Sequence, residues 1–144
     1  MINKIVDGIV NAINTEFGDE FEIYTESIEQ GLEEPCFSVL VLNPTDELFL
    51  NNKHMRTNKF MIQYFPSTSE KNKECNEVLE RLYSRLELIY MGDDLIRGSN
   101  MSGEIIDEVL NFQVNYDMFV YRPTEEMEAM EILDVDVDSR RDDE

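Results

Sequence analysis

LNFQVNYDMFVY, at residues 110–121, is a run of twelve residues whose side chains alternate without a break. Successive side chains of a strand point to opposite faces, so one face of this run begins with Leu110 and Phe112. The other face begins with the amides of Asn111 and Gln113. We therefore predict one long strand with its apolar face against a hydrophobic core.

Working back from this strand, hydrophobic periodicity and turn residues divide the rest of the chain. Apolar residues spaced by three and four predict helices, alternation predicts strands, and Gly or Pro marks their ends. We expect Asn43-Pro44 to stop a strand and Ser102-Gly103 to form a hairpin turn. The predicted elements are a helix at 2–17, strands at 21–26, 36–42 and 60–65, a helix at 69–90, and strands at 95–101 and 110–121.

The order of these elements, α-β-β-β-α-β-β, indicates an α+β fold. Strands that follow one another through short turns favour antiparallel pairing. We therefore predict a small, mostly antiparallel sheet of about five strands with both helices on one face. Pro123 ends this domain, which spans residues 1–123.

The charge balance is strongly acidic, with 32 acidic residues against 12 basic ones and a net charge of -20. Residues 1–123 have 22 acids and ten bases, so the domain itself repels phosphate backbones and we expect no sequence-specific contact with nucleic acid. Residues 124–144 have ten acids and two arginines, with too little apolar mass to pack alone. We predict that this acidic extension is disordered or only conditionally helical.

Residues able to do chemistry are few and scattered. Cys36 and Cys75 lack CxxC spacing, so we expect two buried free thiols, with a disulfide or a metal pair as the alternative. His54 stands in a polar loop with no nucleophile motif nearby, and the six glycines form no phosphate-binding loop. No apolar run approaches the roughly 18 residues of a membrane span. We predict a soluble protein that is not an enzyme and has no cofactor, metal site or membrane contact.

Two groups of polar residues are candidates for contacts between copies of the chain. The first is a basic cluster, because an acidic protein that self-associates must offset like-charge repulsion somewhere. The second is the amide-rich face of the last predicted strand, since amides cost less to bury than charges when they find hydrogen bonds. Simple solvent exposure is the alternative for both groups. The candidate interface residues are Lys53, Arg56, Lys59, Asn111, Gln113, Asn115 and Asp117.

Segments spread over nearly all of residues 1–122 resemble a known family in their order and spacing. They are Met1–Ile9, Glu16–Asp19, Glu29–Leu32, Glu34–Phe37, Asn43-Pro44, Arg56–Phe60, Gln63–Pro66, Glu74–Asn76, Leu95–Gly98 and Leu110–Asp117. Together they resemble the phage tail terminator proteins found in prophages of Gram-positive bacteria. The segment from Thr124 onward has no counterpart in this resemblance.

The resemblance implies a small sheet backed by two helices and a structural protein without catalytic residues. It implies that six copies form a ring on the last ring of tail-tube protein, stop polymerisation and present a surface to the head-side connector. The implied partners are other copies of the chain, the tail-tube protein, the connector and, in a contractile tail, the sheath. The implied location is the virion, after assembly in the host cytoplasm.

Two other functions stay open at this point. One is a different neck or head–tail joining protein of similar fold. The other belongs to a different class, an acidic DNA-mimic inhibitor of a host protein, which would need carboxylates spaced like phosphates along one face. The acids of this chain are scattered, which counts against a DNA mimic.

Overall fold

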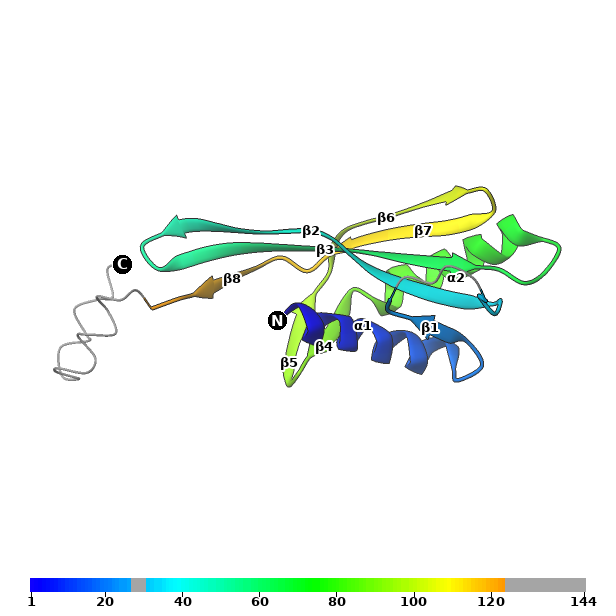
Figure 1. Cartoon of the computed structure of the whole chain (residues 1–144), viewed down its shortest axis with the longest axis horizontal. Coiled ribbons are helices and arrows are strands. Elements are labelled where there is room, and N and C mark those ends of the chain that lie inside the picture. The colour runs from blue at the N-terminus through cyan, green and yellow to red at the C-terminus, as the bar shows by residue number, and fades with distance from the viewer. Residues whose placement is uncertain (27–30, 124–144) are drawn as a thin grey trace. The chain divides into compact units, whose positions relative to one another are not determined.

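A computed structural model of the chain describes residues 1–26 and 31–123 (Figure 1). The chain forms two compact units, which we call the body and the hairpin unit. The body consists of Met1–Asn43 and Asn58–Tyr116, and the hairpin unit consists of Pro44–Thr57 with the described residues from Asp117 onward. Each unit is described by itself below.

The secondary structure confirms an α+β fold with a mostly antiparallel sheet. The elements are α1 (Ile2–Phe17), β1 (Glu22–Tyr24), β2 (Cys36–Leu50), β3 (Lys53–Phe65), α2 (Lys71–Arg85), β4 (Leu88–Met91), β5 (Asp94–Arg97), β6 (Ser99–Ile106), β7 (Val109–Asn115) and β8 (Met118–Tyr121). The main sheet has six strands rather than the predicted five, in the order β1-β2-β3-β7-β6 with β8 also paired to β3. β1 is parallel to β2, and β4 and β5 form a separate antiparallel pair.

The body folds around one hydrophobic core between its sheet and the two helices. Figure 1 shows α1 and α2 on the same side of this sheet, as predicted. The ring of Tyr83 on α2 lies edge-on to that of Phe112 on β7, with centroids 5.6 Å apart. Each buried Ile, Leu, Val or Phe contributes roughly 1.5–3 kcal/mol. The core side chains include Ile5, Ile9 and Ile13 from α1, Phe37, Phe60, Ile62, Tyr64, Leu110, Phe112 and Val114 from the sheet, and Cys75, Val78 and Leu82 from α2.

Helix α1 has the predicted bounds, whereas α2 ends earlier than predicted. Gly18 follows α1 with a φ of 90°, a left-handed value that favours glycine. α2 ends at Arg85. Leu86 and Ile89, which extended the predicted helical pattern, are buried although they lie after the helix. The Leu86 carbonyl accepts a hydrogen bond from the Tyr116 hydroxyl at 2.6 Å, and Ile89 reaches the core from strand β4.

The prediction that Asn43-Pro44 stops a strand is wrong. β2 continues to Leu50, and β3 starts at Lys53, so the segment predicted as a loop is a β-hairpin with a turn at Asn51-Asn52. Asn51 takes a left-handed φ of 52°, which asparagine tolerates in tight turns. Asn43 also has a positive φ, 41°, and a local irregularity of this kind lets a strand contain a proline.

The predicted long strand at 110–121 is also divided, into β7 and β8. β7 and β8 pair with β3 in one continuous register, so the division is only a short gap, opposite the completely buried Asn58. Its Nδ2 donates to the Tyr116 carbonyl at 2.9 Å, and the Tyr116 N–H donates to the Asn58 carbonyl at 2.8 Å. These bonds hold the main chain at Tyr116 directly after β7 ends, so the regular alternation of the sequence spans two strands.

One further turn and one further strand differ from prediction. Ser102-Gly103 lies inside β6, and the turn between β6 and β7 is Asp107-Glu108, with φ values of 52° and 66°. Two successive positive φ values are typical of a two-residue hairpin turn. The predicted strand at 95–101 breaks at Gly98, where a Cβ would lie 2.7 Å from the Leu86 carbonyl oxygen.

Other predictions have different outcomes. Cys36 and Cys75 are free and buried, as expected. Within the described ranges, no helix combines the length and apolar character needed to cross a membrane. The predicted acidic extension at 124–144 lies outside the described residues, so its state and the domain boundary at residue 123 stay predictions.

Candidate subunit interfaces

The hairpin unit carries an aromatic cluster on one face of its small sheet. Lys53 lies directly opposite Tyr121, and Met55 opposite Phe119, so these four residues share a face. The rings of Phe49 and Phe119 meet edge-on with centroids 5.0 Å apart. We call this surface the aromatic face, and it consists of Phe49, Lys53, Met55, Phe119 and Tyr121.

Lys53 is held over the rings of the aromatic face. Its Nζ lies 4.2 Å from the ring centroid of Phe119, 5.5 Å from that of Phe49 and 5.9 Å from that of Tyr121. A cation over an exposed ring gains about 0.5–1 kcal/mol. The aromatic face therefore presents a positive charge at a fixed place on an apolar surface.

The aromatic face is largely exposed. Phe49 is 60% exposed, Phe119 42% and Tyr121 64%. The described residues of the hairpin unit form strands and turns without a helix, so the unit supplies no second layer for this face. An exposed, contiguous apolar surface of this kind often marks a site where a protein contacts a partner.

The other face of the hairpin unit holds an ion cluster around Asp46, which we call the ionic face. Nδ1 of His54 lies 2.8 Å from Oδ1 of Asp46, and Nε of Arg56 lies 3.5 Å from Oδ2. The Arg122 guanidinium also donates to Oδ2 of Asp46. The cluster connects β2, β3 and the residue after β8, so its charges are engaged within the unit.

The body has a polar sheet face opposite its helices, which we call the amide face (Lys59, Gln63, Asn111, Gln113 and Asn115). Lys59 lies opposite Asn115 in the register of β3 and β7, and Gln63 lies opposite Asn111. Nε2 of Gln63 donates to Oδ1 of Asn111 at 2.9 Å. A shallow depression on this side of the sheet is lined by Met61, Ser102, Gly103, Glu104, Ile106, Asn111 and Gln113.

The structure places six of the seven predicted interface residues on three different faces. Lys53 belongs to the aromatic face and Arg56 to the ionic face, because side chains an odd number of residues apart on a strand point to opposite faces. Asp117 lies between β7 and β8 in the hairpin unit. Lys59 joins the three predicted amide residues on the amide face, where Asn115 is already buried within the chain, at 7% exposure. The basic cluster is therefore not one patch, and the role of all seven residues in contacts between copies stays a prediction.

The sequence analysis missed Phe49, Phe119 and Tyr121 as interface candidates. A signal was present, because Phe119 and Tyr121 occupy the side of the alternating run that is polar from Asn111 to Asp117. Apolar residues on both sides of a strand indicate cover on both faces. The hairpin unit does not provide that cover from its own described residues.

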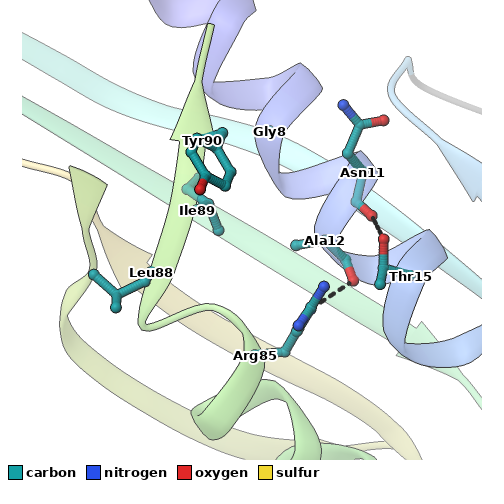
Figure 2. Close-up of a pocket in the computed structure, with 8 residues that line it drawn as sticks. All are labelled: Gly8, Asn11, Ala12, Thr15, Arg85, Leu88, Ile89 and Tyr90. Carbon is teal, nitrogen blue, oxygen red and sulfur yellow. Dashed lines mark hydrogen bonds between the residues drawn. The ribbon is translucent and has the colours of Figure 1, made fainter. Parts of the chain in front are cut away.

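A groove of about 230 Å³ lies between α1 and β4 of the body (Figure 2). Its polar groups bond to the main chain of α1: Nε of Arg85 donates to the Ala12 carbonyl at 3.3 Å, and Oγ1 of Thr15 donates to the Asn11 carbonyl at 2.9 Å. At Gly8 the helix approaches β4 so closely that a Cβ would collide with the Tyr90 carbonyl oxygen. Arg85 thus joins the end of α2 to α1, Thr15 bonds within α1, and the small Gly8 allows the close approach to β4.

The thiols of the body are poorly suited to chemistry. Burial, reinforced by the nearby carboxylates of Glu34 and Glu22, raises the pKa of Cys36 to about 11. Burial also raises the pKa of Cys75. A thiol that stays protonated at neutral pH is a poor nucleophile and a poor metal ligand. No group of three or more His, Cys, Asp or Glu side chains in the described parts of the chain is placed to hold a metal ion.

Comparison with protein families gives a match over most of the chain. The model of a family described as phage tail terminator protein matches residues 4–128. The match covers both the body and the hairpin unit and extends past the predicted domain end at residue 123. A comparison with curated proteins finds no match.

Proposed function

The chain belongs to the phage tail terminator protein family, and we propose that its copies form a ring at the head-proximal end of the tail tube. Membership makes it a structural component of the phage tail, and so of the virion. In the proposal, six copies close the ring, stop the tube from growing and provide the joint to the neck. Its partners are then other copies, the tail-tube protein, the connector and, in a contractile tail, the sheath. Assembly takes place in the host cytoplasm.

The family match over residues 4–128 is the observation that carries this proposal. The unlike surfaces of the two units support it. A terminator must bind its neighbours in the ring, complement the end of the tube and present something else to the neck. The aromatic, ionic and amide faces differ in chemistry, which is what three unlike contacts require.

A closed ring stops growth of the tube because the face toward the tube differs from the face toward the neck. Contacts between unlike surfaces of successive copies close into a ring when the rotation between copies is suitable. A stable contact of this type buries about 800 Å² on each partner. The surface that faces the tube must complement the end of the tube, where another tube subunit would otherwise bind. The opposite surface must not bind tube subunits.

We assign the amide face to a contact with the tube or the neck. Its amides hydrogen-bond among themselves, as Gln63 does with Asn111, and can exchange these bonds for bonds to a partner at little cost. Lys59 supplies a positive charge beside Asn115. Lys59→Glu therefore tests this surface, whereas reversal of Arg56 would act on the ionic face and break its ion pair with Asp46.

Deletion of the gene from the phage tests the function. We expect tails of uncontrolled length that lack heads, counted and measured by negative-stain electron microscopy of lysates. Supply of the intact chain from a plasmid should restore normal particles. Normal virions from the deletion strain would overturn the proposal.

The same images separate the other two functions. Loss of a different neck protein would leave tails of normal length without heads, because tube length would still be controlled. Loss of a DNA-mimic inhibitor would leave virion structure unchanged and reduce phage yield only in hosts that have the inhibited protein.

A further inference from the structure

Exposed large apolar side chains of the described residues gather in two places. The first is the hairpin unit, with Leu48, Phe49, Leu50, Phe119 and Tyr121. The second is the outward face of the β4–β5 pair in the body, with Leu88, Tyr90 and Leu95, each between 43% and 63% exposed. The others in the described ranges are scattered, at Met1, Leu32, Val41 and Ile106.

We call the second group the β4–β5 patch (Leu88, Tyr90 and Leu95). Tyr90 lies directly opposite Leu95, and Leu88 shares their face because it precedes Tyr90 by two residues. Asp93 lies in the turn between the two strands and Asp94 is the first residue of β5; both are exposed. The patch is thus an apolar surface with two carboxylates near one end and Arg97, which lies opposite Leu88 and pairs with Glu87, at the other.

A ring needs two unlike surfaces on each copy. If one surface bound itself on the next copy, the contact would be complete in a dimer and no ring would form. The aromatic face and the β4–β5 patch are unlike, lie in different units and are both uncovered by the rest of the described chain.

Charge favours pairing these two surfaces. The body has 19 acids and seven bases, whereas the described residues of the hairpin unit have three of each. Two bodies therefore repel each other, and the extension after residue 123 adds a further net charge of -8, so attraction between copies has to come from charges at the contact itself. Lys53 on the aromatic face matches the carboxylates of Asp93 and Asp94 beside the β4–β5 patch.

We propose that the aromatic face of the hairpin unit docks on the β4–β5 patch of a neighbouring copy. The rings of Phe49, Phe119 and Tyr121 cover the patch, and Lys53 pairs with Asp93 or Asp94. This inference rests on the proposed ring and names the surfaces that build it.

Cysteine cross-linking in assembled tails tests the contact. The variant Tyr121→Cys/Leu95→Cys places one thiol on each surface, and tails that contain it are oxidised and separated on a non-reducing gel. We expect a ladder of covalent oligomers up to the size of the ring, because each copy bonds to the next. The natural thiols do not interfere, since Cys36 and Cys75 are both completely buried.

Three control chains fix the interpretation. Tyr121→Cys alone and Leu95→Cys alone should stay monomeric on the gel. Tyr121→Cys/Asn72→Cys, with its second thiol exposed on α2 outside the patch, should also stay monomeric. A dimer from Tyr121→Cys alone would show like-to-like contact and overturn the inference, and so would assembled tails of the double variant that give no ladder.

A charge swap provides a second test that does not depend on oxidation. Lys53→Glu should lower the yield of head-joined tails by about tenfold, the effect of roughly 1.4 kcal/mol per contact. Adding Asp93→Lys and Asp94→Lys to the same chain should restore most of that yield, and failure to restore it counts against the contact. Normal virions after gene deletion would instead refute the proposed function, whereas rings without this pairing refute only the inference.

Discussion

The body and the hairpin unit differ in how far their aromatic side chains are buried. Phe112 on β7 of the body is completely buried between the sheet and α2, whereas Phe49 on β2 of the hairpin unit is 60% exposed. The body has two helices to cover one sheet face, and the described hairpin unit has none. The core that stabilises the fold therefore lies in the body, and the described hairpin unit leaves its aromatic side chains exposed.

Truncation of one ring in each unit gives the largest expected difference. Phe112→Ala removes a buried ring and leaves a cavity, so the free energy of unfolding should fall by about 3–5 kcal/mol in urea titrations followed by circular dichroism. The matched change, Phe49→Ala, removes the same atoms from an exposed site where the ring contacts Phe119 and Lys53, and should lower this free energy by about 1 kcal/mol. Equal losses would mean that the hairpin unit is covered in the isolated chain.

A substitution at the α1–β4 contact sharpens the picture of the body. Gly→Ala inside a helix normally stabilises by about 1 kcal/mol, but at Gly8 the new Cβ would meet the Tyr90 main-chain oxygen, which cannot rotate away. We expect Gly8→Ala to destabilise by about 1–3 kcal/mol in thermal unfolding. Asn14→Ala, at an exposed position of the same helix, should stabilise slightly. A gain at Gly8 would mean that α1 can move away from β4.

The smallest expected effect depends on pH and again belongs to the body. Burial alone would raise the pKa of Glu74, but hydrogen bonds from Thr68, Tyr64 and Ser67 outweigh burial and lower it. A lowered pKa stabilises the folded state above the usual carboxyl pKa near about 4.3, and this stabilisation is lost as pH falls through the lowered value. Glu74→Gln should cost about 1 kcal/mol at pH 7.

The acid side of the stability curve checks the role of Glu74. Stability should decrease less steeply with falling pH in Glu74→Gln than in the natural chain, measured by urea titrations between about pH 3 and 7. Glu77→Gln, at an exposed position of α2, should leave the steepness unchanged. An unchanged slope in Glu74→Gln would mean that the carboxylate does not gain its hydrogen bonds on folding.

Much of the body could be predicted from the sequence because its elements have one apolar side each. Ile5, Ile9 and Ile13 recur at helical spacing and are all buried, and the alternation of Leu110, Phe112 and Val114 places them in the core. The amides beside them lie on the opposite face, as their spacing predicts. Periodicity predicts the buried residues here because the helices pack on one face of the sheet, so each element has one buried side.

The candidate contact surfaces could be predicted only in part. Lys53, Arg56 and Lys59 are close in sequence, but strand geometry places the first two on opposite faces and the third in the body. The aromatic face joins Phe49 to Phe119, seventy residues later in the chain, through the pairing of β8 with β3. No local pattern contains that pairing, since it depends on which strands become neighbours.

The sequence by itself determined the fold class, both helices, the buried faces of the body and the excess of acid. Tertiary structure alone decided where the strands end and which surfaces remain open. The alternation is interrupted where Asn58 bonds to Tyr116, and β2 continues through Asn43 and Pro44, beyond the residues that pair with β1. Periodicity states which side of an element is apolar, but hydrogen bonds between distant residues decide what covers it.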